Sequence, residues 1–412
     1  MNRAGKVPFM VIGGGIGGLA SALAVARTGR PVHVIEKAPE FGELGAGLQL
    51  APNALRVLDR LGVLGEIGRY AIYPRRLVLA DVMSGAEIGA LDLGGKFQAR
   101  YGYPYLVMHR GDLLDILLAA CRAIGLVSLE TSKEAEAVED LADSARVRCA
   151  DGSMYDCGAV VGADGLWSVT RKATIGDGDP DPSPFVAYRG PVAVSQARRH
   201  PFFDDMVVWV GPGMHFVQYL IHYGELYNQV AVFRSSRFRA GSDDWGTPDE
   251  LDARFSVTCP VVREAYRQLW RDRRWQIVDR PPAGNWTRNR ITLLGDAAHP
   301  MHQYLAQGAC QALEDAACLA GSLERHDDAG TAFLAYQEAR IPRTALLQDT
   351  ARRFGDVFHA DGAAASLRNA LLAAHPSDEY SYVDWMYAYQ PPLQAEPAAE
   401  LPAEKPASVQ RS

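Results

Sequence analysis

Cysteine is scarce in this sequence, and long apolar runs and an excess of basic residues are absent. The 412 residues include six cysteines, none in a C-x-x-C pair, so we expect buried free thiols and no bound metal. No stretch approaches the roughly 20 apolar residues that span a bilayer. No export signal opens the chain, so a cytoplasmic location is expected. The balance of 42 basic and 49 acidic residues argues against a nucleic-acid-binding protein, which needs a basic face.

The order of the apolar segments predicts an α/β fold with one domain inserted into another. A continuous apolar run at 7–12 predicts a buried strand, and a helix and a second strand follow. From about residue 185, short β-rich runs predict an inserted antiparallel sheet, and a buried strand returns at 291–294. The expected divisions are 1–184 for the first part of the α/β domain, 185–284 for the inserted β-sheet substrate domain, 285–390 for the second part with C-terminal helices, and 391–412 for a disordered tail rich in Pro, Ala and Glu.

A glycine-rich turn follows the first strand. Gly13, Gly15 and Gly18 form a G-x-G-x-x-G pattern, and Glu36 closes the next strand 18 residues after Gly18. In this context the glycines let the backbone approach a pyrophosphate, the helix N-terminus offers N–H groups, and the acid accepts from a ribose hydroxyl. The pattern predicts a Rossmann-like dinucleotide site, but it does not distinguish FAD from NAD.

Two later strands end in an acidic turn. Asp164 follows the strand in V-V-G-A-D-G-L-W-S, and Asp296 follows the strand in I-T-L-L-G-D-A-A-H-P. A carboxylate at such a position can hold a ribose or ribityl hydroxyl, although each dipeptide alone is more often a simple turn. The three motifs in this order, with Arg110 between the first two, form a specific combination that distinguishes FAD from NAD binding.

With these motifs the sequence resembles the single-component FAD-dependent aromatic hydroxylases, the family of the para-hydroxybenzoate and salicylate hydroxylases. The resemblance extends over essentially the whole chain before the tail. It implies bound FAD, O2 as co-substrate, NADH or NADPH as a transient reductant, and a homodimer. The cofactor-binding residues expected on this basis are Gly13, Gly15, Gly18, Glu36, Lys37, Gly47, Gln49, Arg110, Asp164, Asp296, Gln307, Gly308 and Ala309.

Four segments are similar to members of this family that act on 3-hydroxybenzoate. They are Ala187–Gly190, Gly211–Tyr219, Gln303–Ala309 and Asp384–Trp385. The resemblance implies hydroxylation of 3-hydroxybenzoate para to its hydroxyl group, which gives gentisate (2,5-dihydroxybenzoate). It also implies that His215, Tyr219 and Gln303 are the catalytic groups facing the substrate. An apolar residue is expected at position 302, where this sequence has histidine. His302 either faces solvent or alters the pocket, and it therefore affects which substrate is expected.

The alternation of a strand supports such a site. His215, Val217 and Tyr219 lie on one face of the predicted strand, and Phe216 and Gln218 lie on the other. A base that removes the phenol proton activates the ring's ortho and para carbons, and a positioned base contributes about 10²–10⁴-fold. Histidine has the pKa nearest neutrality. The pattern alone favours a structural histidine here, and the resemblance favours catalysis.

Three further features of these motifs carry predictions: His299, Arg189 and the start of the long helix. His299 is expected to be structural, beside the cofactor. Arg189 is open between a surface position, a cofactor contact and a place on the path of a moving flavin. The start of the long helix at 306–308 is expected to face the flavin, because a helix N-terminus favours nearby negative charge by about 0.3–1 kcal/mol.

Several alternative functions remain. The main one is salicylate hydroxylase, or another hydroxylase of a small phenolic or hydroxypyridine acid. The Gln303–Ala306 segment argues against it, and Gln49 stands where a related 6-hydroxynicotinate monooxygenase has histidine. A flavin halogenase lacks support because no W-x-W-x-I-P segment is present. A non-catalytic FAD-binding redox sensor or interaction module is disfavoured by the polar strand face.

Overall fold

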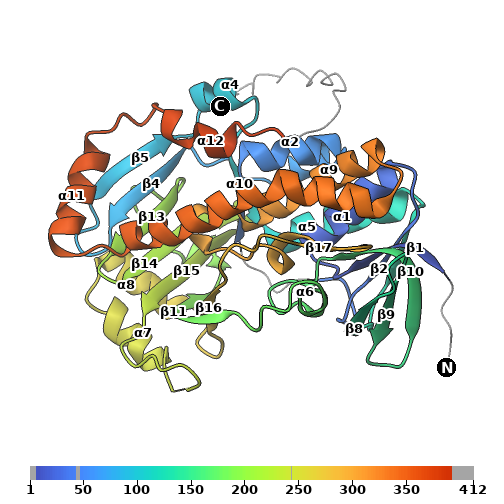
Figure 1. The fold of residues 1–412 in the computed structure, drawn as a ribbon. Helices are drawn as coiled ribbons and strands as arrows, with labels where there is room; N and C mark the ends of the chain where they lie inside the picture. Colours follow the sequence, from blue (N-terminus) through green and yellow to red (C-terminus); the bar gives the residue numbers. More distant parts are fainter. Residues whose placement is uncertain (1–5, 43–46, 243, 392–412) are drawn as a thin grey trace.

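The computed structural model describes residues 6–42, 47–242 and 244–391. The tail predicted to be disordered, 391–412, lies outside the described residues except for Pro391. Two large sheets lie side by side, and the long helix α10 (Ala329–Phe358) runs across both (Figure 1). This arrangement confirms the predicted α/β architecture with a second, β-rich layer.

The first sheet is built around five parallel strands. In spatial order they are β18 (Ile291–Leu293), β10 (Met154–Gly162), β1 (Val7–Ile12), β2 (Val32–Ile35) and β7 (Val127–Glu130). The antiparallel strands that extend it are β8 (Ala135–Asp140), β9 (Ala145–Cys149) and β17 (Thr287–Arg288). The pairing of β18 with β10 joins two distant parts of the chain in one sheet. A strand that follows the β-rich segment in sequence therefore completes the sheet begun at the N-terminus, as predicted.

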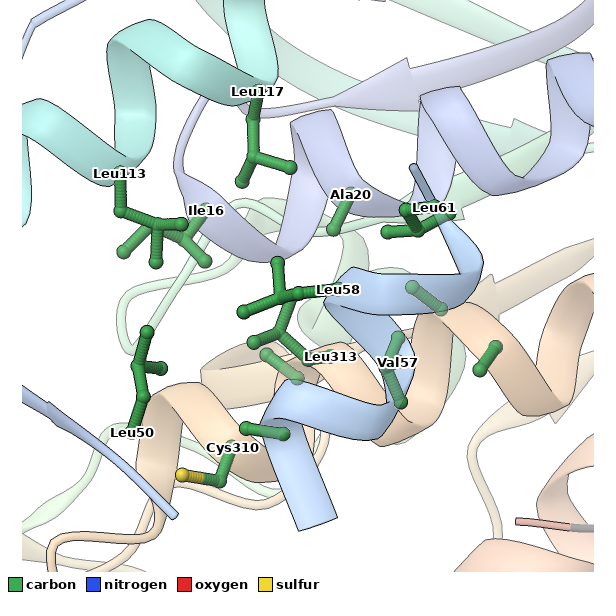
Figure 2. Packing of buried hydrophobic residues seen from close by; sticks show 14 of the residues in the cluster. Ile16, Ala20, Leu50, Val57, Leu58, Leu61, Leu113, Leu117, Cys310 and Leu313 are labelled. Carbon is green, nitrogen blue, oxygen red and sulfur yellow. The ribbon is translucent and has the colours of Figure 1, made fainter. Parts of the chain in front are cut away.

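Helices cover this sheet and form the main core. They include α1 (Ile16–Arg27), α2 (Pro52–Arg60), α5 (Arg110–Ala123) and α9 (Gly308–Arg325). Figure 2 shows Ile16, Leu58, Leu113 and Leu313 from these four helices pointing toward one another. Each such side chain contributes about 1.5–3 kcal/mol when fully buried. This packing holds the N-termini of α1 and α9 beside the ends of the parallel strands.

The second sheet is mixed and carries the wall of the site. In spatial order its strands are β16 (Trp275–Asp279), β11 (Asp181–Arg189), β15 (Leu226–Arg234), β14 (Met214–Ile221), β13 (Met206–Gly211), β4 (Arg76–Asp81) and β5 (Glu87–Asp92), and β12 (Val192–Ala193) pairs with β15. Along β14, Phe216 packs in the core behind the sheet, whereas His215 and Tyr219 line a cavity on the other face. The predicted alternation of this strand is confirmed.

The second sheet departs from the predicted inserted domain in one respect. Strands β4 and β5 come from residues 76–92, outside the predicted 185–284 segment, and β13 pairs with β4 in parallel. The sheet is therefore neither a single inserted segment nor wholly antiparallel. The physical reason is that β4 and β5 bury apolar side chains on the same layer as β13, and such pairing between distant segments leaves no local pattern.

Smaller elements connect the two layers. A two-stranded sheet of β3 (Gly47–Leu50) and β6 (Leu106–His109) lies where they meet. The short helices are α3 (Leu64–Ile67), α4 (Gly95–Tyr101), α6 (Val169–Thr174), α7 (Pro248–Phe255), α8 (Pro260–Ala265), α11 (Gly362–Ala373) and α12 (Asp384–Tyr387). All six cysteines are buried free thiols, as predicted. Within the described ranges, no helix has the length and apolar character needed to cross a bilayer.

Candidate flavin and substrate site

A cavity of about 1390 Å³ lies between the two layers. The carboxyl ends of β1, β2 and β10, the start of α9 and the exposed face of β14 all contribute to its lining. Pockets for a single drug-sized ligand measure about 300–1,000 Å³. This cavity therefore has room for a dinucleotide and a small ring together.

The glycine-rich turn after β1 forms one end of the cavity. Gly13 has φ +106°, and a Cβ there would lie 2.4 Å from the backbone oxygen of Ala163, so only glycine fits this turn. Glu36 and Lys37, which are predicted to bind the cofactor, line the cavity. The carboxylate of Glu36 accepts hydrogen bonds from the backbone N–H of Gly14 at 2.7 Å and of Ala38 at 2.9 Å. These bonds hold the acid in place at the end of β2.

Gly18 is predicted to bind the cofactor, and it lies behind the turn rather than in the lining of the cavity. Gly13 and Gly15 line the cavity, but Gly18 does not. A Cβ at Gly18 would lie 1.9 Å from the oxygen of Gly13. Its role is close packing of helix α1 against the turn, which is the part played by the third glycine in this kind of motif.

The two predicted aspartates both line the cavity, and they differ in their hydrogen bonding. Asp164 follows β10 and accepts from the Ser168 hydroxyl at 2.6 Å and from the backbone N–H of Thr170 at 3.0 Å. It therefore also fixes the start of α6. Asp296 lies in the short 3-10 turn η4 (Gly295–Ala297) and is exposed to the cavity. Of the two carboxylates, that of Asp296 has the greater freedom to accept a hydroxyl group.

At the N-terminus of α9, residues with small side chains bring the backbone to the cavity. Ala306, Gly308 and Ala309 line it, and Ala306 adopts φ +53°. The side chain of Gln307, predicted to bind the cofactor, turns instead into the protein. Its Oε1 accepts from Asn53 Nδ2 at 3.0 Å and from Gln311 Nε2 at 3.1 Å. This orientation of the side chain follows from burial, because a buried amide needs hydrogen-bond partners.

Arg110, which is predicted to bind the cofactor, begins α5 and lines the cavity. Burial lowers the pKa of its guanidinium, and the nearby Asp296 acts in the opposite direction. The charge of Arg110 and that of Asp296 therefore lie within electrostatic reach of each other at the rim of the predicted flavin site. This pair is suited to orient a polar ligand between them.

Strand β3 places Gly47 and Gln49, which are also predicted to bind the cofactor, in the lining of the cavity. A Cβ at Gly47 would lie 2.5 Å from Cε2 of Tyr219, so β3 can approach β14 only through glycine. Tyr105, which the sequence did not single out, donates its hydroxyl to Gln49 Oε1 at 2.6 Å. Burial raises the pKa of both tyrosines, so they act as neutral hydrogen-bonding groups.

His215 lies on β14 with 2% of its surface exposed. Its Nδ1 lies 2.8 Å from Nε2 of His359, the residue that ends α10. Burial lowers the pKa of His215 well below its usual value, and burial lowers the pKa of His359 to about 4. Both rings are therefore neutral at neutral pH. No sequence motif pointed to His359, because it meets His215 only through the path of α10.

Gln303, His302 and Arg189 complete the substrate end of the cavity. Gln303 begins the 3-10 turn η5 (Gln303–Leu305), and its Oε1 accepts from Nη2 of Arg189 at 3.4 Å. Arg189 thus faces the cavity, which settles the open alternatives against a surface position. His302 also lines the cavity and lies 3.7 Å from Asp279. The predicted structural role of His299 is met by its contact with Asp315 at 2.6 Å.

The residues present fit FAD. The turn at Gly13 leaves no room for a Cβ, and the N-terminus of α9 opens onto the same cavity. Nε of Arg189 is buried without a hydrogen-bond partner among the described residues, so the site is incomplete without an anionic or polar ligand. These features define a flavoprotein site with space for a second, smaller molecule.

Comparison with known proteins assigns the fold to one family. The FAD binding domain family matches residues 6–351. The chain belongs to this family, and within it to the single-component FAD-dependent aromatic hydroxylases. Bound FAD, predicted from the motifs, is confirmed at the level of the family.

Two relatives extend along nearly the whole chain. The 3-hydroxybenzoate 6-hydroxylase 1 of Aquipseudomonas alcaligenes is 40% identical over 385 residues, which cover 92% of this chain and 97% of the relative. The 3-hydroxybenzoate 6-hydroxylase of Polaromonas naphthalenivorans (strain CJ2) is 38% identical, covering 93% and 96%. Among solved structures, Klebsiella pneumoniae HpxO complexed with FAD and uric acid has a TM-score of 0.78 at 25% identity, covering 90% and 93%.

Proposed function

We propose that the protein is a monooxygenase that converts 3-hydroxybenzoate to gentisate, using O2 and NADH or NADPH. The observation that carries the proposal is the pair of polar groups at the substrate end of the cavity. His215 supplies a neutral imidazole, and Arg189 supplies a partly buried cation whose Nε is buried. A small aromatic ring with one hydroxyl and one carboxylate matches this pair. The names of the two relatives support the same substrate.

The chain's own residues bind and activate the substrate. The hydrogen bond to His359 uses Nδ1 of His215, so Nε2 is the nitrogen left to take the phenol proton. The resulting phenolate directs reactivity to its ortho and para carbons. Arg189 holds the carboxylate, and Gln303, which contacts Arg189, fixes the ring's position. Tyr219 closes the wall of the cavity.

FAD, when bound, would supply the redox and oxygen-transfer chemistry. Gly13, Gly15 and Glu36 would hold its dinucleotide end, and Asp164 and Asp296 would hold its sugar hydroxyls. The N-terminus of α9 would place backbone N–H groups beside the flavin ring, where they stabilise negative charge. The apolar lining excludes water from the reacting centre.

Product identification tests the proposal. The FAD-loaded protein is incubated in air with NADH or NADPH and, separately, with 3-hydroxybenzoate, salicylate or 4-hydroxybenzoate. We expect gentisate from 3-hydroxybenzoate alone, with one oxygen derived from ¹⁸O₂. Catechol from salicylate would assign the chain to the alternative substrate. Consumption of the nicotinamide with no new aromatic product from any of the three would contradict the proposal. Light scattering tests the homodimer that belongs to the same proposal.

A further inference from the structure

The two histidines at the end of the cavity are held together by several contacts. His359 stacks on Phe185 with ring centroids 4.4 Å apart and lies 5.4 Å from Tyr304. Its backbone oxygen accepts from the N–H of Gly213, in the hairpin that leads into β14. The orientation of the His359 ring is therefore fixed by both layers, and its Nε2 is aimed at Nδ1 of His215.

A hydrogen bond between two imidazole nitrogens needs one N–H group and one lone pair. Because both rings are neutral, only two arrangements exist. In one, His359 donates to His215, and His215 then carries its proton on Nε2 and cannot act as a base. In the other, Nδ1–H of His215 donates to His359, and Nε2 of His215 keeps a free lone pair. Only the second arrangement allows the role of base assigned above.

We propose that His359 is a positioning residue that holds His215 in the Nδ1–H tautomer and carries the substrate's proton away from the cavity. This inference rests on the proposed function. The phenol proton bonds to Nε2 of His215, the Nδ1 proton of His215 moves to Nε2 of His359, and the Nδ1 proton of His359 passes to water. Each ring gains one proton and loses one, so neither ring stays charged.

The surroundings explain why such a transfer is needed. His215 is enclosed by Tyr304, Phe358 and His359, so burial disfavours an imidazolium there. His359 is only partly buried, at the end of α10. The titratable groups that face it are Tyr304 and, by its electrostatic effect, His302. Passing the proton outward moves positive charge from a closed position to a more open one.

The tautomer can be measured directly, without turnover. Nitrogen NMR of the FAD-loaded, ¹⁵N-histidine-labelled protein at neutral pH distinguishes a protonated ring nitrogen from a bare one. His215→Asn and His359→Gln variants assign the signals. We expect a protonated Nδ1 and a bare Nε2 on His215. A protonated Nε2 on His215 would overturn the inference, whatever the substrate proves to be.

Variants test the transfer in the working enzyme. His359→Phe keeps a ring stacked on Phe185 but removes the acceptor, so we expect hydroxylated product per nicotinamide oxidised to fall about tenfold or more, with KM little changed. His359→Gln retains an acceptor oxygen, so it should keep the tautomer and recover part of the coupling. His326→Phe, at the end of α9, is the matched control. Unchanged coupling in His359→Phe would refute the role of His359. Absence of product in the wild type would instead refute the proposed function.

Discussion

Arg189 and Gln303 meet across the substrate end of the cavity, with 3.4 Å between Nη2 of the arginine and Oε1 of the amide. The two residues come from strand β11 and from the turn before α9, so they join the second sheet to the flavin-binding layer. No carboxylate of the described residues forms an ion pair with Arg189, and burial lowers the pKa of its guanidinium. A largely desolvated cation without an anion is costly, and under the proposed function the carboxylate of the substrate would be its partner.

Replacing this cation should weaken substrate binding. Hydrogen bonds to charged groups contribute about 1.5–3 kcal/mol, so Arg189→Met should raise KM about 10- to 150-fold, with a smaller effect on kcat. Steady-state kinetics with 3-hydroxybenzoate as the substrate gives both KM and kcat. Arg273→Met is the matched control, because Arg273 is exposed and lies 5.0 Å from the ring of Trp275, on which Arg189 also stacks. Equal effects of the two substitutions would contradict the assignment.

The glycine turn should determine whether flavin is retained. Gly18→Ala places a methyl group 1.9 Å from the oxygen of Gly13, which forces α1 away from the turn. We expect purified Gly18→Ala to carry much less FAD than the wild type, as measured by the ratio of flavin to protein absorbance. Gly65→Ala, in α3, meets no atom within 4 Å and should retain the wild-type ratio. Full flavin content in Gly18→Ala would show that the contact is relieved at little cost.

The flavin-binding half was predictable because its signals are local. The turn at Gly13, the acid at Glu36 and the strand leading to Asp296 each form a short pattern with a defined neighbour. The two-residue period of a strand predicted that His215 and Tyr219 lie on the same face. These patterns specify which residues approach the cavity from each element.

What depends on distant segments was not predictable. His359 reaches His215 from 144 residues away, at the end of a helix whose direction is set by packing. Strands β4 and β5 join the second sheet by pairing with β13, and neither strand carries a motif. Gln307 lies between residues that line the cavity. Its side chain nevertheless points into the protein, because it accepts hydrogen bonds from the buried amides of Asn53 and Gln311.

A buried ion network should support both stability and the flavin site. Arg340 donates to Asp315 at 2.7 Å and to Glu314 at 2.6 Å, and all three side chains are fully buried. Asp315 also accepts from the N–H of Gly295, next to Asp296. Arg340→Met removes a buried cation and leaves Arg343 as the partner of Glu314 and His299 as the partner of Asp315. The loss should lower the free energy of unfolding by about 3–5 kcal/mol.

Urea unfolding of the FAD-loaded protein measures this loss. Arg353→Met is the control, because Arg353 is exposed on the same helix α10. It should change the free energy of unfolding by less than about 0.5 kcal/mol. If both variants unfold at the same urea concentration as the wild type, the network does not contribute as proposed.

Stability should fall in mild acid because several histidines are buried in the neutral state. Burial lowers the pKa of His200 and of His359 to about 4, and it lowers that of His215 well below its usual value. An unfolded histidine has a pKa of about 6.5, so below that pH the unfolded chain binds more protons than the folded one. Stability is therefore complete above about pH 6.5 and decreases toward pH 4, by about 1.4 kcal/mol per pH unit for each such histidine.

Urea unfolding at about pH 7.5, 6 and 5 measures this slope. His359→Phe removes one of the groups that must be protonated on unfolding, so its stability should fall less steeply with acid, by about one proton. His326→Phe, at the end of α9, is the control for removing a histidine elsewhere in the chain. A wild-type stability that stays constant from about pH 6.5 to 5 would mean that these histidines are solvated, and the neutral pair required by the proton transfer would then be absent.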